Sequence, residues 1–202
     1  MFEGVRETPR SELLVVNIFI PRHPHVPSGV YARSRFWPVL LARFSQGDVK
    51  AFREAGDRAL GLNPNNPDIL ADYGLHLMMS GDTARGRLFL KAAMVLNPAP
   101  PDWYYFPLFS EHFQRGEYEE ALDMALRVHN EEFYWTHCMH AMAYQSLGMK
   151  QDARDAVDRL ISLYPDFADK AREELSQWVS GERLEADLDV LRAAGLQVSI
   201  HD

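Results

Sequence analysis

Apolar residues recur along the chain with the spacing of an α-helix, and glycine or proline interrupts them at regular intervals. Residues 67–80 show the i, i+3, i+4, i+7 spacing of one helical face with Leu70, Tyr73, Gly74 and Leu77. A second helix after Gly81 carries a similar stripe with Gly86, Leu90 and Ala93. Because the small residues let two helix axes approach closely, this segment predicts a tightly packed helix pair.

The same pair is repeated along the chain. Four glycines separated by 34, 35 and 32 residues mark the turn between two helices: Gly47, Gly81, Gly116 and Gly148. Proline follows the second helix of three units, at Pro64, Pro98 and Pro165, where it would stop the helix. One pair cannot bury its apolar face alone, so the pattern predicts an all-α fold with about four helix pairs stacked over residues 36–166.

These repeats resemble the tetratricopeptide repeat (TPR) family, whose unit of about 34 residues has this spacing of glycine, alanine and proline. Residues 67–100 carry the match through Gly74, Leu77, Gly81, Leu90, Ala93 and Pro98. Residues 134–167 carry it through Ala141, Tyr144, Gly148, Ala153 and Pro165. Residues 36–66 match in the second helix, and residues 101–133 lack the closing proline and end at 130–132. The resemblance implies a right-handed αα superhelix, a TPR-like solenoid.

A narrower resemblance covers residues 40–196. The segments 103–107, 115–122, 133–137, 164–167, 172–178 and 191–196 together look like the C-terminal repeat tails of certain bacterial signalling proteins. In those proteins the tail follows a nucleotide-cyclase domain or a winged-helix DNA-binding domain, and neither domain is present in this chain. The resemblance therefore implies an alternative function, a regulatory or sensor tail that acts in trans or by self-association.

The two ends of the chain depart from the repeat. Residues 167–178 and 184–194 each predict an amphipathic helix, and Gly195 is suited to stop the second one. We expect residues 167–196 to cap the last repeat and residues 197–202 to form a tail. Residues 1–35 are rich in proline and arginine and predict an irregular or poorly ordered arm. The apolar run 13–20 is too short to span a bilayer, and its flanks do not fit a signal peptide.

Composition and charge narrow the function further. The chain of 202 residues has a formal net charge of −8; residues 1–44 hold six arginines and three glutamates, which leaves −11 for the remainder. This acidic body argues against a nucleic-acid or anionic-membrane partner. The single cysteine, Cys138, excludes an internal disulfide and favours a cytoplasmic location.

No segment predicts a catalytic, cofactor or metal site. Residues 81–88 resemble a phosphate-binding loop only superficially, because arginine and leucine stand where lysine and serine or threonine are needed. His137, Cys138 and His140 are close enough in sequence for a metal site, with His129 one helix earlier, but a complete ligand set is not indicated. Cys138 has no candidate oxyanion hole. We therefore predict a non-enzymatic protein without a cofactor.

The resemblance to TPR proteins implies a concave groove lined by the first helix of each unit. The groove residues that it implies are aromatic or long and apolar: Leu75, Met78, Met79, Trp103, Phe106, Phe113, Trp135, Met139 and Met142. Such a surface suits an apolar or amphipathic segment of a protein partner. The alternative is that a terminal helix of the same chain, or the N-terminal arm, fills the groove.

Overall fold

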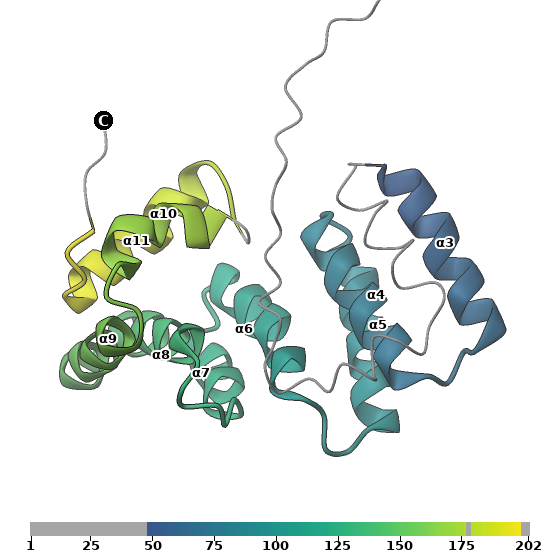
Figure 1. The fold of residues 1–202 in the computed structure, drawn as a ribbon, viewed down its shortest axis with the longest axis horizontal. Helices are drawn as coiled ribbons and strands as arrows, with labels where there is room; N and C mark the ends of the chain where they lie inside the picture. The colour runs from purple at the N-terminus through teal and green to yellow at the C-terminus, as the bar shows by residue number, and fades with distance from the viewer. Residues whose placement is uncertain (1–47, 177–178, 199–202) are drawn as a thin grey trace, which may run out of the picture. The chain divides into compact units, whose positions relative to one another are not determined.

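The computed structural model describes residues 48–176 and 179–198, and all regular elements in these ranges are helices. They are α3 (Val49–Leu62), α4 (Pro67–Met79), α5 (Thr83–Leu96), the 3-10 helix η1 (Asp102–Tyr104), α6 (Tyr105–Gln114), α7 (Tyr118–Leu126), α8 (Tyr134–Ser146), α9 (Lys150–Leu163), α10 (Phe167–Ser176) and α11 (Glu182–Ala194) (Figure 1). The predicted all-α class is confirmed. The predicted arm over residues 1–35 lies outside the described residues.

The chain divides into two compact units, Met1–Arg58 and Ala59–Asp202. In the first unit the structure describes the start of α3, where Asp48 Oδ1 accepts the N–H of Ala51 at 2.9 Å and so caps the helix. The predicted domain boundaries at residues 35 and 166 stay predictions.

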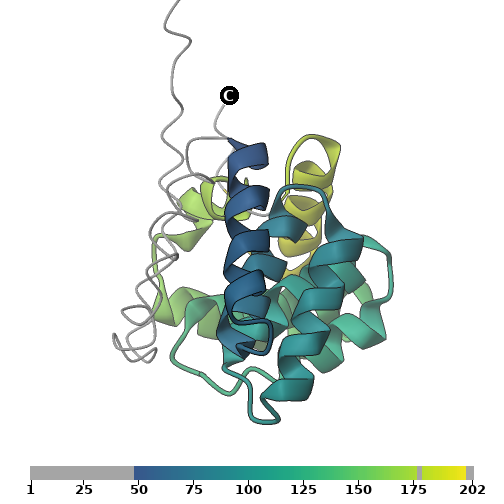
Figure 2. The same ribbon diagram turned by 90° about the vertical axis from the view of Figure 1, so that its right-hand side faces the viewer.

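Three helix pairs follow one another in the second unit, α4 with α5, α6 with α7 and α8 with α9. Helices α4 and α5 lie side by side in Figures 1 and 2. Each pair turns at a glycine with positive φ, as the repeat predicts: Gly81 (88°), Gly116 (74°) and Gly148 (76°). The next residue then donates its N–H to the carbonyl five positions earlier, as Asp82 does to Leu77 at 2.9 Å.

The close contact between α4 and α5 explains Gly74 in α4 and Gly86 in α5. Gly86 belongs to the segment 81–88, which superficially resembles a phosphate-binding loop. A Cβ added to Gly74 in α4 would lie 2.7 Å from the carbonyl oxygen of Gly86 in α5, and a Cβ on Gly86 would collide with the carbonyl of Gly74. Only glycine at both positions lets the two backbones approach this closely. Gly81 serves the turn and Gly86 serves the packing.

The unit without a closing proline ends differently from the others. Helix α7 stops at Leu126, and Asp102 Oδ2 accepts the backbone N–H groups of His129 and Asn130 at 3.1 and 3.0 Å. Thr136 Oγ1 donates to the carbonyl of Asn130 at 2.9 Å. These bonds hold the loop that replaces the proline stop.

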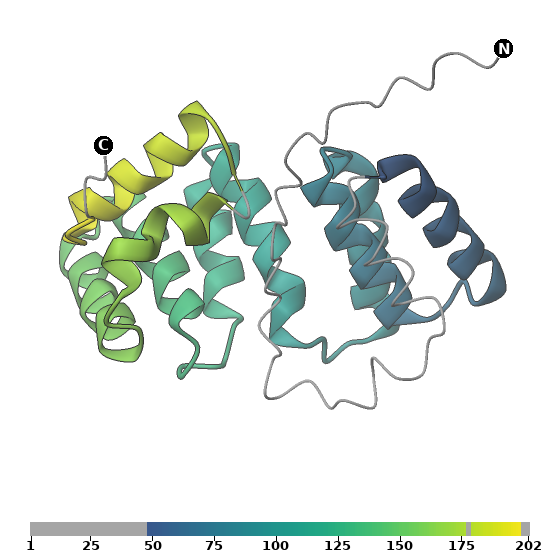
Figure 3. The ribbon, with the colours of Figure 1, turned by 45° about the horizontal axis from the view of Figure 1, so that its top comes forward.

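The second unit contains two apolar clusters. The smaller one joins α4, α5, η1 and α6, and the hydroxyl of its buried Tyr104 donates to the carbonyl of Pro67 at 3.1 Å. The larger one extends from α6 to α11. Helix α11 packs against α8 as well as α10, and Figures 1 and 3 show α10 and α11 side by side. The predicted apolar face of α11 is buried, with Leu184, Leu188, Leu191 and Ala194.

Candidate partner-binding groove

The first helices of the three pairs, α4, α6 and α8, together with η1, form what we call the first-helix face. Eight of the nine predicted groove residues line one of two hollows on this face. Trp103 belongs to neither hollow: it is half-buried on η1, with its ring centroid 4.5 Å from that of Tyr104. The predicted residues therefore fall into two groups with different surroundings.

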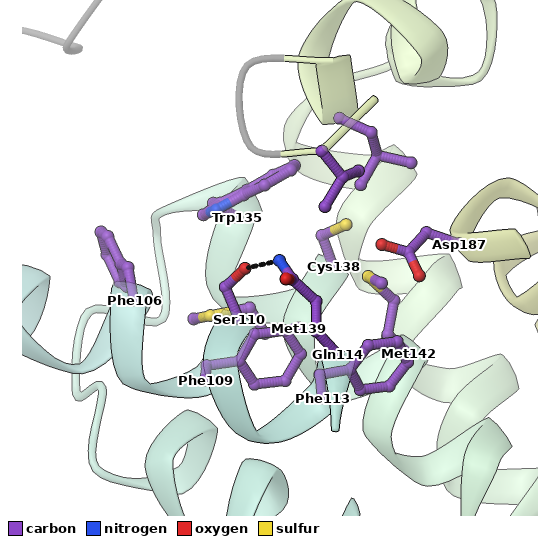
Figure 4. Close-up of a pocket in the computed structure, with 12 residues that line it drawn as sticks. Phe106, Phe109, Ser110, Phe113, Gln114, Trp135, Cys138, Met139, Met142 and Asp187 are labelled. Atoms are coloured by element: carbon purple, nitrogen blue, oxygen red, sulfur yellow. Dashed lines mark hydrogen bonds between the residues drawn. The ribbon is translucent and has the colours of Figure 1, made fainter. Parts of the chain in front are cut away.

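The first group lines a hollow between α6, α8 and the C-terminal helices, which we call the closed hollow (Figure 4). Its walls are aromatic and sulfur-containing: Phe106, Phe109, Phe113, Trp135, Cys138, Met139 and Met142. Leu175, Val179 and Asp187 complete it from the side of α10 and α11. Trp135 is 8% exposed and Met139 is 2% exposed, so a partner reaches them only if the covering helices move. This arrangement favours, for this part of the face, the alternative that a terminal helix covers the groove.

A single arginine ties α11 to α6 at the edge of the closed hollow. Arg183 Nη2 donates to the carbonyl of Phe113 at 3.1 Å, and its guanidinium lies 5.2 Å from the centroid of the Phe113 ring. The positive charge therefore meets the C-terminal end of α6, where the helix dipole is negative. Arg183 Nε also lies 2.8 Å from Asp187 Oδ1.

Asp187 brings a carboxyl group into an apolar environment. Burial raises its pKa from the ordinary value of 3.8 to about 6, although Arg183 opposes this shift. Figure 4 shows the carboxyl group directed toward Cys138 and Met142.

The second group, Leu75, Met78 and Met79, lines what we call the open hollow, between α4 and α6. Thr83, Pro107, Ser110, Glu111 and Gln114 complete its lining. All three predicted residues are half-buried, and among the described helices other than α4 and α6 only α5 contributes to the lining, through its first residue Thr83. Ser110 and Gln114 belong to both hollows, and the hydrogen bond of 2.9 Å between them, dashed in Figure 4, marks the boundary.

The lining of the open hollow includes a carboxylate that sequence reasoning missed. Glu111 lies on α6, its side chain is 6% exposed, and its Oε1 accepts from Arg87 Nη1 at 2.6 Å. The sequence held one indication of it, because Glu111 is the only acidic residue of α6. Its partner Arg87 is 24 residues away in sequence, however, and belongs to a different helix pair.

The histidine and cysteine candidates are held by structural contacts. His137 Nε2 lies 2.8 Å from the carbonyl oxygen of Glu131, and burial lowers the pKa of His140. Burial also raises the pKa of the Cys138 thiol well above its ordinary value, which disfavours the reactive thiolate. Within residues 48–176 and 179–198, no three histidine, cysteine, aspartate or glutamate side chains form a group that could hold a metal ion.

No family model matches the chain, and no curated protein matches it either. The helices nevertheless form a TPR-like solenoid, and solved structures share this fold. A crystal structure of MamA protein aligns with a TM-score of 0.58 and 23% identity over 79% of this chain and 87% of that chain. A second MamA crystal structure aligns with a TM-score of 0.58 and 23% identity over 77% of this chain and 92% of its own.

A third structure, the MamA RS-1 ArsTM double mutant, aligns with a TM-score of 0.59 and 13% identity, covering 79% of this chain and 92% of that chain. At these identities the similarity concerns the fold alone. The narrower resemblance to signalling tails stays a prediction. None of the described helices is both long and apolar enough to cross a membrane.

Proposed function

We propose that this chain is a non-enzymatic protein–protein interaction module that binds an apolar or amphipathic segment on its first-helix face. The observation that carries the proposal is the open hollow, where Leu75, Met78 and Met79 stand beside Pro107 with no covering helix among the described residues. Half-buried leucine and methionine side chains in a hollow between two helices suit contact with an apolar or amphipathic segment. The unbranched methionines can adapt their rotamers to a bound side chain.

We assign the first contact with a partner to the open hollow and not to the closed one. Met78 and Met79 are half-buried, whereas Met139 and Met142 are 2% and 4% exposed. A segment can therefore enter the open hollow without displacing α10 or α11. Trp135, Met139 and Met142 would join the interface only after those helices move away.

The proposal includes no catalytic step and no cofactor. The one thiol, Cys138, is buried with a raised pKa, and the histidines close to it are engaged in contacts with the chain. We place the protein in the cytoplasm because a single buried cysteine is compatible with a reducing compartment.

Selection from a displayed library of random peptides tests this function with the full chain as bait. We expect enrichment of peptides with an apolar or amphipathic pattern. The selected peptides should lose affinity for Met79→Ser, which changes the open hollow, and keep it for Leu88→Ser. Leu88 is a matched control because it is an apolar residue, 68% exposed on α5, and does not line the hollow.

Two results would reject the proposed site. If no peptide is enriched over an unrelated acidic helical protein, the chain has no general peptide-binding face. If Leu88→Ser weakens binding as much as Met79→Ser, the interface lies elsewhere. Circular dichroism of both variants checks that neither has lost its helices.

A further inference from the structure

Glu111 presents an unusual polar group in the lining of the open hollow. Its Oε1 accepts from Arg87 Nη1 at 2.6 Å, and Arg115 Nη1 lies 3.5 Å from the same atom. Its other oxygen, Oε2, is buried and has no hydrogen-bond partner among the described residues. A buried carboxylate oxygen without a donor is unfavourable, so a ligand that brings a donor to this atom gains an interaction that the free protein lacks.

The charges around Glu111 indicate what kind of donor fits. Arg115 Nη2 also lies 2.7 Å from Glu117, and His112 Nδ1 lies 2.7 Å from the other oxygen of Glu117. The negative charges of Glu111 and Glu117 are thus already neutralised by the guanidinium groups of Arg87 and Arg115. An incoming lysine or arginine would meet these cations at close range, so a neutral donor fits better than a charged one.

The rest of the lining indicates what should carry this donor. Leu75, Met78, Met79 and Pro107 are apolar, and methionine sulfur packs favourably against aromatic rings. Tryptophan combines a large apolar body with one N–H donor and no acceptor. Its single polar group would be satisfied by Glu111 Oε2, whereas the hydroxyl of tyrosine would leave its acceptor positions without donors and phenylalanine would leave Oε2 unpaired.

We propose that the open hollow selects a tryptophan of the partner segment, whose indole N–H donates a hydrogen bond to Glu111 Oε2. This inference rests on the proposed function and specifies its ligand. The flexible side chains of Met78 and Met79 move aside to admit the ring. Glu111 acts as the specificity-determining residue, and the methionines supply the apolar contact.

The test uses a tryptophan-containing peptide from the library selection and a synthetic copy in which benzothienylalanine replaces the tryptophan. Benzothienylalanine keeps the size and shape of the indole but has sulfur in place of N–H. For the wild-type chain we expect the copy to bind on the order of tenfold more weakly, the usual effect of losing a hydrogen bond to a charged group. For Glu111→Gln, which offers only a neutral acceptor, we expect the difference between the two peptides to shrink.

The outcomes separate this inference from the proposed function. Equal affinity of the two peptides for the wild-type chain would overturn the tryptophan proposal and leave the interaction function intact; this comparison does not depend on whether Glu111→Gln folds. Enrichment of apolar peptides without tryptophan would have the same meaning. A dimer in light scattering that Met79→Ser dissociates would also overturn the tryptophan proposal, because a second copy would then be the occupant.

Discussion

The closed and open hollows lie on the same face and each contains two methionines of a first helix, yet they differ in accessibility. Both use apolar residues of first helices, and both include Ser110 and Gln114. The closed hollow has α10 and α11 over it, so that Cys138 is fully buried and Met139 nearly so. The open hollow has no such cover among the described residues.

This difference shows that an apolar pattern on a first helix does not by itself identify a partner site. The methionines of α8 belong to the same buried cluster as the leucines of α11, a helix that packs against α8. The methionines of α4 meet no equivalent helix in the described part of the chain. Which residues bind a partner therefore depends on the helices that come later in the chain.

Loss of a buried side chain of α11 should remove most of the difference in accessibility between the two hollows. Leu188 is fully buried on α11, and Leu188→Ala is expected to lower the free energy of unfolding by about 2–5 kcal/mol. Because α11 closes the hollow around Cys138, the thiol should also become reactive. Chemical denaturation and the rate of alkylation by iodoacetamide measure the two effects.

Leu88→Ala is the control for this substitution. Leu88 is 68% exposed on α5, so the same change should alter the free energy of unfolding by no more than about 0.5 kcal/mol. An equal loss of stability in the two variants would contradict the role given to α11.

The open hollow should respond to a change in the packing of α4 on α5. Gly86→Ala places a Cβ against the carbonyl of Gly74 and against Met78, so the two helices must move apart. We expect a loss of about 1–3 kcal/mol in the free energy of unfolding and weaker peptide binding, since Met78 lines the hollow.

Gly61→Ala, in α3, is the matched change without a clash, since no atom lies within 4 Å of the added Cβ. It is expected to leave stability unchanged or to raise it by about 0.5–1 kcal/mol. If Gly86→Ala also left stability unchanged or raised it, that result would contradict the close approach of α4 and α5.

The sequence predicted the repeat, and it left open whether a partner, a terminal helix or the N-terminal arm fills the groove. The glycine turns at Gly81, Gly116 and Gly148 follow from local chain chemistry, and the structure confirms them. The contact between Arg183 and the carbonyl of Phe113 joins residues that are 70 positions apart. The pattern of residues within one helix therefore does not predict it. The position of Glu111 in the lining of the open hollow was not predicted for the same reason, since it depends on how two different helix pairs pack together.

A smaller effect concerns the pH dependence of stability that Asp187 of α11 contributes. Burial raises the pKa of Asp187 to about 6, with Arg183 opposing the shift, so the folded protein holds this proton more tightly than the unfolded chain. The stability contributed by the protonated group is therefore present near pH 4 and is lost as pH rises to about 6. Asp187→Asn does not titrate there. The melting temperature of Asp187→Asn minus that of the wild type should therefore increase between pH 4 and pH 6.

Thermal denaturation of both proteins across this pH range measures the difference. A constant difference in melting temperature would show that Asp187 titrates alike in the folded and unfolded states. That result would contradict the burial of the Asp187 carboxyl group in the closed hollow.

The rate at which a thiol is alkylated in each hollow measures directly how accessible that hollow is. Cys138, the only cysteine of the chain, reports on the closed hollow of the wild type, and Met79→Cys combined with Cys138→Ala reports on the open one. We predict that the thiol at position 79 is alkylated roughly 100-fold faster or more, since Cys138 must wait for local opening of α11. Comparable alkylation rates at the two positions would show that α10 and α11 do not restrict access to the closed hollow.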